Sequence, residues 1–247
     1  MILLAWPIFY VLDFKGEIGS PYGVLVVSNR QILRSFTYGF FKTAFAYSKA
    51  LRSIFSDNSI GVVIDVGANI GDFTLAMSRL SKEVISIEPG RQNFVALNAN
   101  LRRNHVLNVI PLQVAAHNRS EELFLHGSNS DLRVGVEQTG ERVQGLDLDS
   151  IREKLRLTHI DLVKIDVQGH ERSVLEGMAE TLLQKSVELV VVEVHVARGV
   201  SEYDIISLLS KYGYRLLKRD AFLFDQPHLY FAPESFLRGV KGTHVHW

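Results

Sequence analysis

From residue 61 onward, short apolar runs alternate with longer stretches in which apolar residues recur at helical spacing. The apolar runs predict strands at 61–67, 83–89, 108–116, 159–167 and 187–195. The amphipathic stretches predict helices at 72–80, 92–103, 171–183 and 202–212. Strands that alternate with helices favour a parallel sheet with helices on both faces, and strands buried on both faces are apolar throughout. The pattern therefore predicts a doubly wound α/β domain.

Two further strands are predicted near the end of the chain, at 214–219 and 228–233. Only a short segment separates them, which favours an antiparallel hairpin at the edge of the sheet. In open sheets of this kind, ligands bind beyond the carboxyl ends of the parallel strands. Candidate chemistry is therefore expected just past the ends of the strands, after residues 66, 87, 114, 165 and 194.

The first 56 residues have a different pattern. Residues 1–12 are all apolar, but a membrane span needs roughly 20 such residues, and the basic start of a signal peptide is absent. We expect a buried strand or a self-association surface there, with peripheral membrane contact as the alternative. Residues 22–28 predict a strand, and residues 29–55 predict one broken helix or two. The chain thus divides into an N-terminal extension, 1–56, and a main domain, 57–247.

Composition limits the possible functions. The chain has 247 residues, 47% of them hydrophobic and 22% charged, which suits one large folded domain. Lys and Arg number 27 and Asp and Glu also number 27, so the balanced charge gives no reason to expect nucleic acid as a partner. With no cysteine, disulfides and thiolate chemistry are excluded, and a cytoplasmic location is compatible with the sequence.

The end of the first parallel strand carries a glycine-containing turn. In "VVIDVGANIGDF", Asp65, Gly67, Asn69 and Gly71 stand between the strand and the next helix. Glycine permits sharp turns and close approach of a ligand, asparagine tolerates the left-handed region, and a helix start attracts anionic groups. Seventeen residues after Gly71, Glu88 follows the next strand, where one carboxylate can accept hydrogen bonds from both hydroxyls of a ribose.

Together these features predict a site for a nucleoside cofactor. An ordinary tight turn with a solvated glutamate is the alternative. A nicotinamide dinucleotide fits less well, because its fingerprint is G-x-G-x-x-G and the glycines here read G-x-x-x-G.

Charged residues interrupt the fourth strand. Lys164 and Asp166 are two positions apart, so they face the same side of the sheet. Pairing between them would offset the cost of burying each charge. Asp166 also ends its strand, which makes it a candidate for chemistry.

Further polar residues follow the fourth and fifth strands. His170 and Glu171 open the next helix, where the helix dipole alone favours a glutamate and a neutral histidine. Glu193 and His195 end the fifth strand, again two positions apart. His195 is a candidate general base, with a histidine satisfied beneath a loop as the alternative.

Four stretches together resemble the FkbM family of S-adenosylmethionine-dependent methyltransferases: "VVIDVGANIGDFTL", "ISIEPGRQNFVALNANLRRN", "DLVKIDVQGHERSVLEGM" and "VVVEVHV". The resemblance covers roughly residues 61–196. It implies a mostly parallel seven-stranded Rossmann-like sheet whose reversed last strand fits the predicted edge hairpin. It also implies methyl transfer from S-adenosyl-L-methionine to a hydroxyl oxygen of a sugar, glycan or related metabolite. One departure is Gln168, which stands where the family usually has glutamate.

The resemblance also assigns cofactor-binding residues. By it, Asp65, Gly67, Asn69 and Gly71 line the methionine part of the cofactor, Glu88 holds the ribose, and Ala115 and Ala116 flank the adenine.

For catalysis we expect His195 to remove the acceptor proton, because an ordinary histidine pKa of about 6.5 suits neutral pH better than that of an aspartate, about 3.9. Asp166 would orient the acceptor or His195. No metal is required, although Asp166, Glu171, Glu193 and His195 could also bind Mg²⁺. His244 and His246 have the spacing of a metal pair but lack a third ligand, so we expect no site there.

The acceptor is expected to be a small molecule or glycan, and the aromatic residues within 35–47 are expected to cover its pocket. Two alternatives stay open. One is a non-catalytic protein that binds S-adenosylmethionine or a nucleotide, and the other is a nucleic-acid methyltransferase.

Overall fold

The structure is a computed structural model that describes residues 15–20, 23–28, 60–127, 133–135, 139–220 and 226–239. Its centre is a seven-stranded sheet. From one edge to the other, the strands are β12 (Tyr214–Asp220), β13 (His228–Pro233), β11 (Val187–Glu193), β10 (Ile160–Ile165), β3 (Ile60–Val66), β4 (Ser81–Ile87) and β5 (Val109–Leu112). The parallel pairs along β11, β10, β3, β4 and β5 confirm the predicted mostly parallel α/β sheet.

The reversed strand is β13, which runs antiparallel to both of its neighbours, β11 and β12. The predicted terminal hairpin is therefore present, but the prediction of a reversed edge strand is wrong by one position. The connection from β11 to β12 skips one place in the sheet, and β13 returns into that gap. The edge strand, β12, is consequently parallel to the main set.

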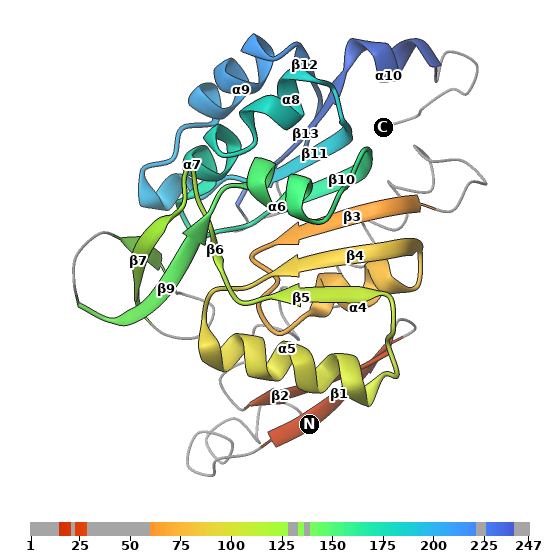
Figure 1. Ribbon diagram of the computed structural model, residues 1–247, viewed down its shortest axis with the longest axis vertical. Helices are drawn as coiled ribbons and strands as arrows, with labels where there is room; N and C mark the ends of the chain where they lie inside the picture. The colour runs from red at the N-terminus through yellow and green to blue at the C-terminus, as the bar shows by residue number, and fades with distance from the viewer. Residues whose placement is uncertain are drawn as a thin grey trace.

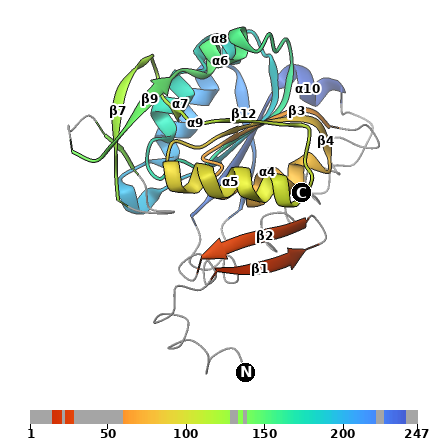
Figure 2. The same ribbon diagram turned by 60° about the horizontal axis from the view of Figure 1, so that its bottom comes forward.

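Helices cover both faces of the sheet (Figures 1 and 2). One face carries α4 (Asp72–Ser78), α5 (Arg91–Arg103) and α10 (Glu234–Gly239), and the other carries α6 (Leu148–Lys154), α7 (Glu171–Glu176), α8 (Ala179–Leu183) and α9 (Glu202–Lys211). Alternate strand residues serve the two layers. Ile64, Ile165 and Val192 pack in the cluster with α6 to α9, whereas their neighbours Val63 and Val191 pack with α4. The doubly wound arrangement is thus confirmed.

The helix predicted at 171–183 is divided into α7 and α8. Gly177 lies at the break, where an added Cβ would be 2.0 Å from the carbonyl oxygen of His117. The helix is therefore interrupted at the point where the backbone of His117 packs against it.

A second sheet lies beyond the carboxyl ends of the main strands (Figure 1). Its order is β6 (Ala115–Ala116), β9 (Glu141–Leu146), β7 (Glu121–His126) and β8 (Arg133–Gly135). The sequence indicated an excursion here but not its strands, because these are short and carry many polar residues. The predicted strand at 108–116 is accordingly divided between the two sheets.

The N-terminal part is described only as an antiparallel pair, β1 (Lys15–Ser20) with β2 (Gly23–Ser28). It lies against the outer side of the α4 and α5 layer (Figure 2). The strand predicted at 22–28 is confirmed, and β1 was not predicted. The interpretations of residues 1–12, 29–55, 244 and 246 lie outside the described residues, so the domain boundary and the pocket cover stay predictions. None of the described helices has the length and apolar character that crossing a bilayer requires.

A buried ion pair joins the two strands at the middle of the main sheet. Lys164 on β10 stands in register with Asp65 on β3. Its Nζ lies 3.3 Å from Asp65 Oδ1 and 3.3 Å from Asp166 Oδ2. The expected pairing of Lys164 with Asp166 is confirmed, and Asp65 is a third member of the network. Desolvation opposes the charge on Lys164, but the carboxylates of Asp166 and Asp65 outweigh it and raise the pKa of the lysine.

Replacing Lys164 by methionine should destabilise the fold strongly. The substitution keeps the apolar stem but leaves the fully buried Asp65 carboxylate without its counter-charge, a loss that typically costs about 3–5 kcal/mol. Lys218→Met is the matched control, because Lys218 pairs with Asp220 where both side chains are more than a quarter exposed, and such pairs contribute less than about 1 kcal/mol. Urea denaturation of both variants tests this, and equal losses would contradict it.

Candidate functional site

The turn after β3 has the backbone that the sequence predicted. Gly67, Asn69 and Gly71 have φ values of 81°, 52° and 93°. The amides of Gly67 and Ala68 both donate to the carbonyl oxygen of Ile87, so the turn is tied to the end of β4. An added Cβ at Gly67 would lie 1.8 Å from the carbonyl oxygen of Asp166. Gly67 is therefore required because the Asp166 backbone comes close to it. We predicted that a ligand would make this close approach.

Glu88 lies directly beside that turn. Its Oε2 accepts from the Asn69 amide at 2.8 Å, and its Oε1 accepts from the Gly90 amide at 3.0 Å and from Asn93 Nδ2 at 3.2 Å. Burial raises the pKa of Glu88 to about 7, although these donors act in the opposite direction. A carboxylate has roughly four acceptor positions, so these three donors leave one, on Oε2, for a hydroxyl of a bound molecule.

The same place contains an acceptor without a donor. Asn69 Oδ1 is buried and accepts no hydrogen bond from the described residues. Buried polar atoms normally have partners, so a bound molecule with a hydroxyl or amine at this position would complete it. Glu88 and Asn69 therefore fit a nucleoside cofactor.

Other predicted cofactor residues have structural contacts. Asp65 is fully buried beneath the turn, where its Oδ2 accepts from Thr74 Oγ1 at 2.6 Å. Ala115 and Ala116 are also buried, Ala115 within the small sheet and Ala116 within the main core. Their contacts with a cofactor stay predictions.

His195 is held between the carboxylate of Glu171, which begins α7, and carboxylates at two strand ends. It follows β11 and is 4% exposed. Its Nδ1 lies 2.6 Å from Glu171 Oε1, which also accepts from the Gly169 amide at 2.9 Å. Its Nε2 lies 3.6 Å from Asp166 Oδ1 and 3.8 Å from Glu193 Oε1, which are ion-pair rather than hydrogen-bond distances. The structure thus brings the two predicted catalytic residues together.

Glu171 has a role that the sequence did not reveal. The dipole of the helix that it begins is enough to favour a glutamate at this position. Its side chain is nevertheless completely buried and forms a hydrogen bond with His195. A carboxylate that accepts from Nδ1 leaves the lone pair on Nε2. The lone pair on Nε2 of the neutral ring therefore faces Asp166.

The charges of this cluster shift its titration. Desolvation would lower the pKa of His195, but the hydrogen bond to Glu171 and the charge of Asp166 raise it above the ordinary value. For Asp166, desolvation would raise the pKa, but Lys164 and then His195 lower it. Asp166 is thus held in its ionised form, and the protonated form of His195 is favoured relative to an ordinary histidine.

Within the described part of the chain, two groups of side chains could hold a cation. Ligand atoms of Asp166, Glu193 and His195 lie within 4.8 Å of one another, although the charge of Lys164 beside Asp166 opposes a cation there. The second group, His159, Asp161 and Glu188, lies at the opposite end of the sheet. In that group Asp161 already accepts from the Val62 amide.

A pair of histidines extends the site toward the small sheet. His117 Nδ1 lies 2.7 Å from His170 Nε2 and 2.8 Å from Ser173 Oγ, while its Nε2 lies 2.6 Å from Glu121 Oε1. Burial and the neighbouring His117 lower the pKa of His170 to about 4. His170 is therefore neutral, as expected, but for reasons other than a helix dipole. His117 was missed, although its place just past the third predicted strand was a usable signal.

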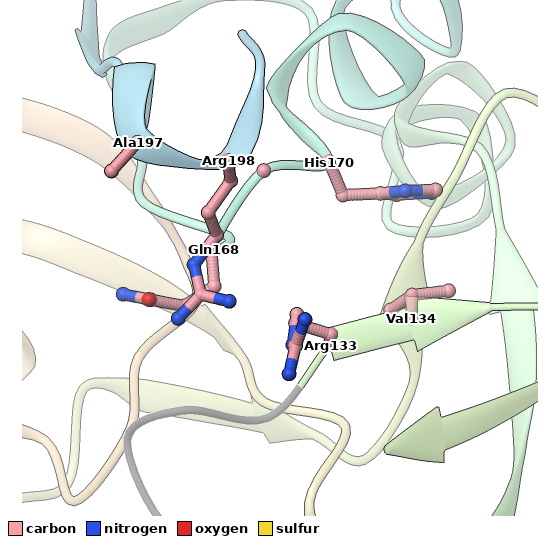
Figure 3. Close-up of a pocket in the computed structure, with 7 residues that line it drawn as sticks. Arg133, Val134, Gln168, His170, Ala197 and Arg198 are labelled. Carbon is pink, nitrogen blue, oxygen red and sulfur yellow. The ribbon is translucent and has the colours of Figure 1, made fainter. Parts of the chain in front are cut away.

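A cavity of about 270 Å³ lies beside this cluster, lined by Arg133, Val134, Gln168, Gly169, His170, Ala197 and Arg198 (Figure 3). Gln168 connects it to the predicted catalytic residues, because its Nε2 lies 3.5 Å from Asp166 Oδ1.

The fold and this site are those of a Rossmann-like methyltransferase. Residues 65–216 match the methyltransferase FkbM domain, and the chain belongs to that family. It is 32% identical over 154 residues to the hexuronic acid methyltransferase AglP of Haloferax volcanii, covering 61% of this chain and 62% of that protein. It also resembles the crystal structure of methyltransferase FkbM from Methylobacillus flagellatus KT, with a TM-score of 0.54, 17% identity, and coverage of 93% of this chain and 59% of that one. The chain thus spans about three fifths of the length of each relative.

The contact between Gly67 and Asp166 can be tested with alanine. Gly67 and Gly199 both have positive φ, but an added Cβ at Gly199 meets nothing within 4 Å. Gly199→Ala should cost only the left-handed strain, about 1–2 kcal/mol. Gly67→Ala should cost a further ~1–3 kcal/mol, because Asp166 directly follows β10 and its amide donates to the Val66 carbonyl oxygen, so its backbone resists displacement. Denaturant midpoints of the two variants provide the comparison, and similar losses would argue against the collision.

Proposed function

We propose that this protein transfers a methyl group from S-adenosylmethionine to a hydroxyl oxygen of a sugar acid or a related small metabolite. The observation that carries the proposal is a juxtaposition. The turn that carries Asn69, with Glu88 beside it, meets the end of β10, where Asp166 lies close to His195. Membership of the methyltransferase FkbM family and the similarity to a hexuronic acid methyltransferase support it.

The cofactor is assigned to the first of these two places. Glu88 Oε2 would accept a hydrogen bond from one ribose hydroxyl, and Asn69 Oδ1 would accept from an adjacent donor. When bound, the sulfonium of S-adenosylmethionine supplies an activated methyl group. The protein then has to align an acceptor oxygen and remove its proton, and alignment can contribute on the order of 7–11 kcal/mol.

The reaction needs one proton acceptor. The acceptor oxygen loses its proton to His195 Nε2 and attacks the methyl carbon, so that an O–C bond forms as the S–C bond breaks. The products are the methyl ether, S-adenosylhomocysteine and a protonated His195. The developing imidazolium lies between Glu171 at Nδ1 and Asp166 near Nε2, and both carboxylates stabilise it.

Glu171 is a positioning residue in this scheme, because it acts on the substrate only through His195. Asp166 is close enough to the Nε2 side to orient the acceptor hydroxyl. The cluster of Asp166, Glu193 and His195 allows a second arrangement in which a divalent cation activates the hydroxyl. Chelator sensitivity distinguishes that arrangement from the metal-free one.

Removing the Glu88 carboxylate should weaken binding through a ribose hydroxyl. One charge-assisted hydrogen bond of about 1.5–3 kcal/mol would be lost in Glu88→Ala. Calorimetry with adenosine and 2′,3′-dideoxyadenosine separates this effect from a general disturbance of the turn. The wild type should discriminate between the two nucleosides, and the variant should not. Unchanged discrimination in Glu88→Ala would remove Glu88 from the ribose site.

The same carboxylate predicts a pH dependence of binding. Because burial raises the pKa of Glu88 to about 7, the ionised form, which accepts from the ribose hydroxyl, is lost as pH falls below that value. Affinity for S-adenosylhomocysteine should therefore decrease from pH 8 to pH 6 in the wild type and stay level in Glu88→Ala.

Turnover at saturating S-adenosylmethionine should fall as pH drops, with a midpoint above the ordinary histidine value of about 6.5. The reason is that the base form of His195 is required and its pKa is raised. His195→Ala should lower turnover by about 10²–10⁴-fold and flatten this limb. Asp166→Asn should also lose activity, and Glu171→Gln should move the midpoint downward.

His159→Ala is the matched control, since His159 is half exposed at the opposite end of the sheet. An acid limb that survives in His195→Ala would rule out His195 as the base. Loss of activity with chelator would then favour the cation arrangement.

A further inference from the structure

The cavity beside the catalytic cluster has a wall of positive charge. Arg133 belongs to β8 of the small sheet, and Arg198 ends the 3-10 turn η2 (Val196–Arg198) that follows β11. Their side chains extend toward each other across the cavity (Figure 3). Of the seven described residues that line it, none carries a carboxylate. Both guanidinium groups reach the same space, so one anion bound there can contact both of them.

The position of Arg198 is fixed by its surroundings. Its amide donates to the His195 carbonyl oxygen at 2.9 Å, so it shares a short turn with the proposed base. Gly169, with a φ of 105°, lies against its stem, and an added Cβ there would be 3.2 Å from Arg198 Cβ and 3.3 Å from Cδ. The absence of a side chain at Gly169 therefore lets Arg198 lie along the cavity.

The cavity and the catalytic pair share a boundary residue. Gln168 lines the cavity, and its amide nitrogen approaches Asp166 Oδ1. A molecule with its anionic group beside Arg133 and Arg198 would hold its neighbouring atoms near Asp166 and His195. The volume of about 270 Å³ lies just below the range of roughly 300–1,000 Å³ for drug-sized ligands, which suits a single sugar ring.

We propose that Arg133 and Arg198 form a subsite for the carboxylate of the methyl acceptor. This inference rests on the proposed function, because it concerns the acceptor of that reaction. The planar guanidinium group presents paired donors that match the two oxygens of a carboxylate. A hexuronic acid carries a carboxylate and hydroxyls on one ring, so one molecule can occupy the subsite and present an oxygen to His195. The subsite selects the acid over the corresponding neutral sugar.

Calorimetry on the full chain saturated with S-adenosylhomocysteine tests the subsite without requiring turnover. The probes are the methyl glycosides of glucuronic, galacturonic and mannuronic acid, each compared with its neutral hexose glycoside. At least one acid should bind about tenfold or more tightly than its neutral counterpart. Arg133→Gln and Arg198→Gln should each reduce that preference, and the double variant should abolish it, while affinity for S-adenosylhomocysteine stays unchanged.

Arg215→Gln is the matched control, because Arg215 pairs with Glu234 near the start of β12, at the other end of the sheet. It should leave the preference intact. Gln168→Glu adds a negative charge to the cavity wall and should reduce the preference without removing either arginine.

Several results would overturn the proposal. Equal binding of acids and neutral sugars, or no binding of any acid, would show that the cavity does not select a carboxylate. Loss of S-adenosylhomocysteine affinity in the arginine variants would assign the arginines to the cofactor's own carboxylate. Tighter binding of glucose 6-phosphate than of every uronide would assign the cavity to a sugar phosphate.

The outcome for the subsite is separate from that for the reaction. Arginine-dependent binding of an acid without methyl transfer would uphold the subsite and contradict the proposed function. Methyl transfer to neutral sugars that neither arginine substitution changes would uphold the proposed function and contradict the subsite.

Discussion

The site depends on one buried ammonium group, the Lys164 Nζ between the carboxylates of Asp65 and Asp166. It joins β3 to β10 at the middle of the sheet and lies 3.4 Å from the Gly67 carbonyl oxygen. Without it, two carboxylates would meet at the carboxyl ends of neighbouring strands and repel each other. With it, Asp65 supports the glycine turn from below, and Asp166 keeps its negative charge at the mouth. The same buried ion pairs of Lys164 therefore support both the proposed cofactor site and the proposed acceptor site.

From Asp166 the network continues outward through His195 to Glu171. Each charge shifts the pKa of its neighbour. Lys164 and His195 lower the pKa of Asp166, and Glu171 and Asp166 raise the pKa of His195. Glu171 fixes which ring nitrogen carries the hydrogen. Such preorganisation is where an enzyme gains most, because the charges need not reorganise during the reaction. The arginine-lined cavity beside it supplies the opposite charge, so an acceptor with one acidic group has a defined orientation.

Local sequence signals predicted the parts of the fold that local forces determine. Strand runs, helical spacing and the left-handed turn at Gly67, Asn69 and Gly71 all follow from the chain's own periodicity and backbone preferences. Side chains two positions apart on a strand lie on the same face of the sheet, and this alternation correctly predicted the pairing of Lys164 with Asp166. The meeting of Asp166 with His195 was expected from their places at the ends of adjacent strands.

The remaining features arise from contacts between distant segments. Glu171 had a sufficient local explanation in the helix dipole, while its actual partner is 24 residues away. The place of β13 depends on which gap the preceding crossover leaves in the sheet, and one strand's pattern does not encode that. The Arg133 and Arg198 cavity joins a short strand of the small sheet to the turn after β11. Neither arginine belongs to a motif, so only the folded chain reveals them as a pair.

The central claim is that Glu171 holds His195 as a base whose free lone pair is on Nε2. Nitrogen-15 NMR of the histidine-labelled protein with S-adenosylhomocysteine tests it most directly, with His195→Ala identifying the signal. We expect the neutral ring of His195 to be protonated at Nδ1 and to titrate with a midpoint above about 6.5. A neutral ring protonated at Nε2, or a midpoint below that value, would contradict the account.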